Sequence, residues 1–134
     1  MDLSALKMKQ IVGIVSFEGK FDINLAYIPR DEMRKILDKC KRTVFVKHQP
    51  TEEVDSEKLV VSLAKCIVGW EGLTVGVVAT MIPIEVPEGQ EAEEVPCTEE
   101  NKLVLLRRAY GFEIFVQTAA TDLSALKQEA ERKN

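Results

Sequence analysis

Residues 11–28 read IVGIVSFEGKFDINLAYI, two β-rich runs separated by the turn residues Glu18 and Gly19. In the second run, apolar residues occupy every other position and polar residues lie between them: Phe21, Ile23, Leu25 and Tyr27. A period of two with one polar face is typical of an antiparallel strand with one buried face. The stretch therefore predicts a β-hairpin whose apolar face needs a covering layer.

The segments after the hairpin show helical periods, which supply that layer. Pro29 suits the first turn of a helix, and an apolar stripe at helical spacing follows it. Thr98 is predicted to cap a later helix, with two glutamates in its first turn. Helices are predicted at 30–41, 55–68, 98–110 and 112–132, and further strands at 44–47 and 73–86. The sequence thus predicts an α+β fold in which a small antiparallel sheet, the hairpin plus one or two further strands, packs against about four helices.

The length of 134 residues fits a single domain spanning 1–134. Within it we expect a disordered N-terminus at 1–9, an acidic, proline-rich loop at 83–97 and a charged helical tail at 121–134. The apolar share of 46% supports a packed core, and no apolar run is long enough to predict a membrane span.

The chemically reactive residues are few and scattered. Cys40, Cys66 and Cys97 are widely spaced and odd in number, which fits a reducing cytoplasm better than a disulfide scaffold. With His48 they form no zinc-binding spacing, and no phosphate-binding glycine motif occurs. Cys97 paired with His48 is the one nucleophile that we weigh against a solvated histidine and a structural cysteine. We therefore expect no enzyme: no catalytic residue, no cofactor and no metal site.

Two regions are candidates for binding another macromolecule. Residues 30–47 contain seven bases against three acids, a local charge of +4 that could contact phosphate, although the chain as a whole carries −4. The C-terminal helix has an apolar seam with steps of three and four residues, which suits either the chain's own core or a partner. The seam residues predicted to bind a partner are Phe112, Val116, Ala119, Leu123 and Leu126. Trp70, Gly72 and Thr98 are predicted to be structural anchors.

The segments CIVGWEGL at 66–73 and PCTEENK at 96–102 together resemble the phage tail assembly chaperone family. In that family, a helix ending in a Trp–x–Gly step leads to a loop, and the loop ends in a Pro–x–Thr–x–Glu-like helix start. The resemblance covers roughly residues 10–120 and includes the hairpin and the helix that begins at Pro29. One departure is the long β-rich and acidic stretch between Gly72 and Pro96, where the family has a brief turn.

The resemblance implies a non-catalytic protein that binds the long helical tape measure protein, or another tail protein, during assembly of a phage or prophage tail. It also implies self-association and a location in the cytoplasm of a bacterial host cell. The lack of an apolar run predicts no membrane partner, and the net charge of −4 makes nucleic acid an unfavoured partner. The alternative is a protein-interaction or weak nucleic-acid-binding module that uses the basic region 30–47.

One feature stands outside these interpretations. The hexapeptide Asp-Leu-Ser-Ala-Leu-Lys occurs at 2–7 and again at 122–127. Six residues are far fewer than a structural repeat unit needs, so the sequence alone offers no physical account of the duplication.

Overall fold

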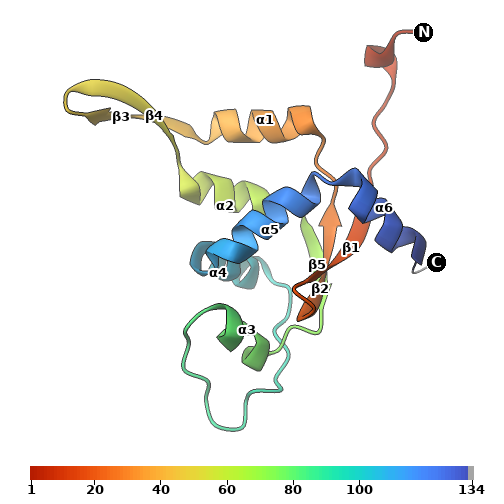
Figure 1. Ribbon diagram of the computed structural model, residues 1–134, viewed down its shortest axis with the longest axis vertical. Coiled ribbons are helices and arrows are strands. Elements are labelled where there is room, and N and C mark those ends of the chain that lie inside the picture. The colour runs from red at the N-terminus through yellow and green to blue at the C-terminus, as the bar shows by residue number, and fades with distance from the viewer. Residues whose placement is uncertain (133–134) are drawn as a thin grey trace.

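The computed structural model describes the backbone of residues 1–132 and the burial of side chains 1–127. It confirms the α+β class, with six α-helices and five strands in two sheets among the described residues (Figure 1). The strands are β1 (Val12–Phe17), β2 (Phe21–Ala26), β3 (Lys41–Val46), β4 (Gln49–Val54) and β5 (Ile67–Glu71). The α-helices are α1 (Arg30–Lys39), α2 (Ser56–Ala64), α3 (Val75–Met81), α4 (Glu99–Arg108), α5 (Tyr110–Ala120) and α6 (Leu123–Arg132).

The predicted hairpin is present as β1 and β2, with Phe17 opposite Phe21. The turn between them places Glu18 and Gly19 in the left-handed region, at φ 51° and 71°. The alternation places Phe21, Ile23 and Leu25 on the buried face. The sheet order is β1-β2-β5, with both pairs antiparallel.

The third strand of this sheet is β5, so the prediction of a helix over 55–68 was wrong at its C-terminal end. The helix α2 ends at Ala64, and the chain then pairs with β2 through a hydrogen bond from the Ala26 amide to the Cys66 carbonyl at 2.8 Å. The free edge of β2 needs backbone partners, and the β-branched Ile67 and Val68 suit that role.

The predicted strand at 73–86 was also wrong, because its centre is the helix α3. Thr74 caps this helix, its hydroxyl accepting a hydrogen bond from the Val77 amide at 3.3 Å. Val78 and Ile82 turn toward the core at helical spacing. A cap and a buried face outweigh the β-propensity of valine here.

The predicted strand at 44–47 overlaps β3, which ends at Val46 and does not join the main sheet. It pairs instead with β4, and the two strands form a separate hairpin. Residues 49–54, for which no strand is predicted from the sequence, therefore form β4.

The core lies between the main sheet and the helices α2, α4 and α5. Phe112 of α5 is fully buried and stacks on Phe21, with ring centroids 6.0 Å apart. Its ring also meets Phe17 edge-on at 5.4 Å. The predicted long helix over 112–132 is divided at Thr121 into α5 and α6, and α6 packs against β1.

The two remaining predicted regions lie outside this core. Residues 83–97 contain no helix and no strand, but their backbone is bonded to the segment before α3, for example from the Val95 amide to the Leu73 carbonyl at 2.9 Å. At the N-terminus, a short 3-10 turn covers Leu3–Ala5, and none of residues 1–10 is buried. Each helix in the described part is too short or too polar to cross a bilayer.

The close approach of α6 to β1 gives the first prediction. A Cβ at Gly13 would lie 2.4 Å from the Leu126 carbonyl oxygen, so Gly13→Ala should push α6 away and destabilise the protein by about 1–3 kcal/mol. Urea unfolding measures this change. Gly111→Ala is the matched control, since nothing lies within 4 Å of its Cβ, and alanine in a helix should stabilise by up to about 1 kcal/mol. Equal stability of the two variants would contradict the contact.

Candidate protein-binding surface

The predicted partner-binding seam faces the protein's own core. Phe112, Val116 and Leu126 are each 0% exposed, while Ala119 and Leu123 are half-buried beside them. The hypothesis that these residues form an outward binding face was therefore wrong for the three buried members. The physical reason is that the apolar face of the three-stranded sheet has to be covered, and the seam covers it.

The three predicted anchors each have a local contact or conformation that a structural role requires. The Trp70 indole N–H donates to the Val95 carbonyl at 2.7 Å, which joins β5 to the end of the acidic loop. Gly72 adopts φ 82°, a conformation that favours glycine. Thr98 caps α4, its hydroxyl accepting from the Asn101 amide at 3.2 Å.

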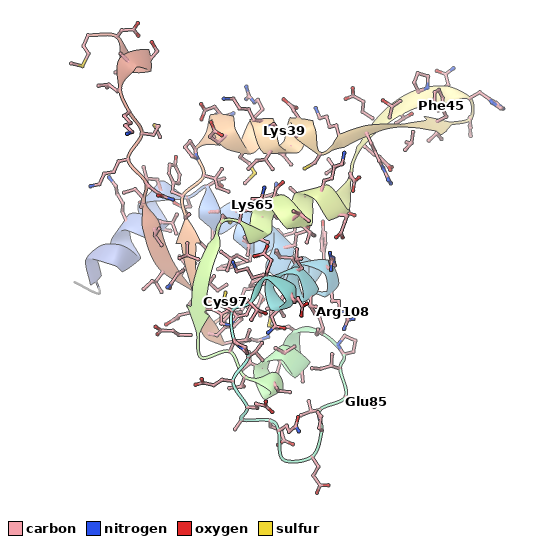
Figure 2. All side chains as sticks on the ribbon, turned by 180° about the vertical axis from the view of Figure 1, so that it is seen from behind. Lys39, Phe45, Lys65, Glu85, Cys97 and Arg108 are labelled. Atoms are coloured by element: carbon pink, nitrogen blue, oxygen red, sulfur yellow. The ribbon has the colours of Figure 1, made fainter. Side chains whose placement is uncertain are left out.

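The structure does not bring Cys97 and His48 together. Cys97 lies in a hollow of about 550 Å³ beside Trp70, whereas His48 is in the turn of the β3–β4 hairpin, next to the strand that carries Phe45 (Figure 2). Burial raises the pKa of the Cys97 thiol, and it raises the pKa of Cys66 to about 11. Both effects oppose the thiolate that a nucleophile needs. Among the residues that the structure describes, no cluster of three or more metal-ligating side chains occurs.

The basic region 30–47 is less positive in space than along the chain. Its bases are distributed over α1, β3 and the following turn, and β4 places Glu52 and Glu53 beside β3. Ion pairs within or next to the region join Lys35 to Glu32, Lys41 to Asp38, and Arg42 to Glu53.

Three exposed apolar side chains lie on the hairpin of β3 and β4, which we name the arm (residues 41–54). It projects from the body in both views (Figures 1 and 2), and none of its residues is buried. Phe45 is 73% exposed, Val46 54% and Val54 44%. An isolated two-stranded hairpin is marginally stable in water, so exposed apolar side chains on it indicate a surface for a partner.

The turn of the arm is unusual in its residues. Lys47 and His48 both have positive φ, at 53° and 65°. Two-residue hairpin turns of this kind favour Asn-Gly, because bulky residues are strained there. The tip of the arm therefore carries two large side chains, those of Lys47 and His48, where a more stable turn would have small residues.

A groove between α1 and α2 leads toward the root of the arm. Two hollows of about 400 Å³ and 300 Å³ adjoin there, since Lys39 and Ser62 line both. The apolar residues lining them are Ala26, Tyr27, Ile28, Pro29, Ile36, Cys40, Val61 and Cys66. Lysines of both helices line the groove as well, and Figure 2 labels one from each side, Lys39 on α1 and Lys65 beyond α2. The groove thus combines an apolar lining with three lysines, and two glutamates, Glu32 and Glu57, lie at its rim.

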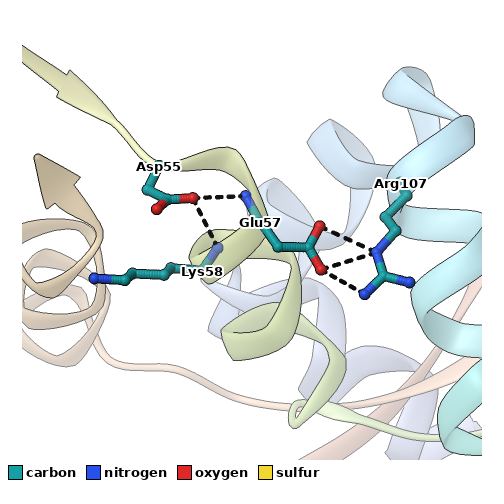
Figure 3. A network of polar contacts seen from close by, with 4 residues as sticks. All are labelled: Asp55, Glu57, Lys58 and Arg107. Carbon is teal, nitrogen blue, oxygen red and sulfur yellow. Dashed lines mark hydrogen bonds and ion pairs between the residues drawn. The ribbon is translucent and has the colours of Figure 1, made fainter. Parts of the chain in front are cut away.

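The α2 wall of this groove is held by polar contacts at its start (Figure 3). Asp55 caps the helix, its Oδ1 accepting from the amides of Glu57 and Lys58 at 3.1 and 3.3 Å. The Arg107 Nε of α4 donates to both carboxylate oxygens of Glu57, at 2.9 and 3.0 Å. These bonds lower the pKa of Glu57 and raise that of Arg107. Because the carboxyl pKa is lowered, this contact stabilises the fold at neutral pH and is lost as the pH falls through the lowered value.

In comparisons with protein-family models, curated proteins and solved structures, nothing matches this chain.

Sequence reasoning missed the arm because residues 50–55 are polar and lack strand character. The available indication was the run Val44-Phe45-Val46, which is apolar at every position and is followed by no apolar run to pair with it. An apolar strand with a polar partner strand leaves at least one of its faces in water.

We expect the arm to be dispensable for folding. The ends of the arm adjoin, since the Asp55 amide donates to the Cys40 carbonyl. Replacing residues 43–52 with Asn-Gly keeps the Arg42–Glu53 pair around a two-residue turn. The free energy of unfolding in urea should change by less than about 1 kcal/mol, because only surface is removed. A loss of more than about 2 kcal/mol would show that the arm belongs to the core.

Thiol reactivity tests the Cys–His hypothesis directly. With a pKa of about 11, Cys66 should be about one part in a thousand thiolate at pH 8 and should resist iodoacetamide. Cys97 should react more slowly than a free cysteine, and His48→Ala should leave its rate unchanged, as followed by mass spectrometry. The urea-unfolded chain is the control for full reactivity. A rapid Cys97 reaction that His48→Ala abolishes would restore the thiol-enzyme hypothesis.

Proposed function

We propose that this protein is a non-catalytic tail assembly chaperone of a phage or prophage, which binds a helical tape measure protein and self-associates. The observation that carries the proposal is the arm, whose apolar side chains are exposed while the seam that could have served a partner is used in the core. The resemblance at 96–102 supports the family, since Thr98 caps a helix there. The Trp–x–Gly step at 70–72, which the family has at the end of a helix, lies at the end of strand β5 in this chain. The protein's place of action would be the bacterial cytoplasm.

The groove beside α1 suits the chemistry of such a partner. A tape measure segment is a long helix with an apolar stripe, which would aggregate alone. An amphipathic helix binds a groove through apolar residues at helical spacing, and the lining between α1 and α2 offers apolar contacts such as Ile36 and Val61. Lysines lining the groove favour a helix with acidic residues beside its stripe.

The acidic loop has a supporting role in this proposal. Seven glutamates lie between residues 83 and 100, with no lysine or arginine among them. In Figure 2, Glu85 marks the loop at the end of the molecule opposite α1. Negative charge away from the binding surface keeps a protein that exposes apolar residues from aggregating.

The alternative function is a protein-interaction or weak nucleic-acid-binding module that uses residues 30–47. One observation favours it: Phe45 is an exposed aromatic ring between Arg42 and Lys47. Exposed aromatic rings among bases can stack on single-stranded nucleic acid. The ion pairs of Arg42 and Lys41 and the net charge of −4 weigh against this function.

The arm residues test both functions together. Co-expression with a tail tape measure protein from the same genome should keep that protein soluble, and Phe45→Ser with Val46→Ser should weaken the complex at least about tenfold. Tyr110→Ser with Ile114→Ser is the matched control, since these side chains are also exposed, at 74% and 42%, but lie on α5. Affinity is measured with the purified proteins.

The result against the proposal is equal affinity of the arm variant and the parent, or no effect of the chain on the solubility of the tape measure protein. Binding of single-stranded DNA that falls steeply with salt and is lost in the arm variant would support the alternative.

A further inference from the structure

The two copies of Asp-Leu-Ser-Ala-Leu-Lys adopt related local structures. Asp2 starts a helical turn in the first copy, its Oδ1 accepting from the Ser4 amide at 3.0 Å. In the second copy, the Asp122 Oδ1 accepts from the Ala125 amide at 3.1 Å at the start of α6. An aspartate cap is a common beginning for a helix. Both copies therefore begin with an aspartate that caps a helical turn, a 3-10 turn in the first copy and the start of an α-helix in the second.

The surroundings of the two copies differ. Leu126 is 0% exposed, whereas its counterpart Leu6 is 52% exposed and Leu3 is 78% exposed. The second copy lies against β1 at Gly13, where an added Cβ would be 2.6 Å from the Leu126 Cα. We name this surface of β1 the Gly13 seat. Only a glycine lets the backbone of a helix approach a strand so closely.

We propose that the N-terminal copy, residues 2–7, is a second ligand for the Gly13 seat and binds it in a second copy of this chain, in place of residues 122–127. The sequence of the ligand is identical to the one that occupies the seat, so the same leucine and the same capped turn are available to it. The two leucines that the N-terminal copy leaves in water would then be covered by the partner molecule.

The Gly13 seat of a second molecule is a better site for residues 2–7 than the seat of the same chain. The Ile11 carbonyl accepts from the Tyr27 amide at 2.8 Å, so the chain is fixed to the sheet from Ile11 onward. Only Met8, Lys9 and Gln10 remain between the hexapeptide and this anchor. The helix at the seat continues past Leu126 to Arg132, whereas a chain returning to its own strand would have to reverse within three residues. In Figure 1 the N-terminal segment leads away from the body.

The exchange is governed by local concentration. Residues 122–127 are tethered to their own seat, and a tether of this kind corresponds to an effective concentration of roughly millimolar. Identical contacts from another molecule compete only when copies are held side by side, for example along a shared partner. The inference deepens the self-association in the proposed function and rests on that part alone, because it does not involve the arm.

Sedimentation velocity of the full-length chain tests the exchange. Leu126→Ala weakens the tethered ligand only, so it should form a dimer at a concentration at least about tenfold lower than the parent. Adding Leu6→Ala to this variant removes the exchanging leucine and should return it to a monomer. Leu6→Ala alone is the matched control and should behave as a monomer with parental stability. A Leu126→Ala chain that stays monomeric would overturn the proposal. This includes the outcome in which Leu6 binds the Gly13 seat of its own molecule.

A second measurement avoids any dependence on how well Leu126→Ala folds. A synthetic peptide of residues 1–10 is titrated into the parent chain, and the amide NMR resonances of Gly13 and Leu126 are followed. Both should shift, and the same peptide with Leu6→Ala should shift neither. Absence of any shift at millimolar peptide would overturn the proposal. Binding of the tape measure protein is measured separately, so failure here and failure of the chaperone function are distinguishable.

Discussion

The contact of Phe112 with Phe17 and Phe21 fixes the position of the C-terminal helices on the main sheet. A sheet of three short strands is stable only when one face is covered, and the ring of Phe112 is fully buried against that face. Aromatic pairs of this geometry contribute about 0.5–1.5 kcal/mol each beyond the area that they bury. The position of α5 follows from this contact, and the positions of α4 and α6 follow from α5 because short connections join them.

This use of the C-terminal seam explains where a binding surface is left. The apolar positions of α5 and the buried leucine of α6 are occupied by the sheet, so they are not available to another protein. Exposed or half-buried apolar residues outside the core then lie on the arm, in the groove beside α1, at the N-terminus and on the outer faces of α5 and β5.

Local patterns predicted the elements whose own residues determine them. The alternation from Phe21 to Tyr27 predicted β2, Pro29 and the stripe after it predicted α1, and Thr98 predicted the start of α4. The errors occur where a distant partner decides. Ile67 and Val68 continue the pattern of α2, yet the free edge of β2 makes them a strand. The valines around Gly76 suggested a strand, yet Thr74 and the core make them a helix. The exposure of the arm and the burial of the seam depend on packing across the whole chain, which spacing alone does not contain.

The adjoining ends of the arm have a consequence for how this protein can diversify. Because Cys40 and Asp55 are joined by a backbone hydrogen bond, the fourteen residues between them form an insertion whose two ends are held together by the body. Such an insertion can lengthen, shorten or change its tip over evolutionary time while the supporting body keeps its shape. Related chains could therefore differ most in the arm, and two proteins with nearly the same body could carry unrelated arms.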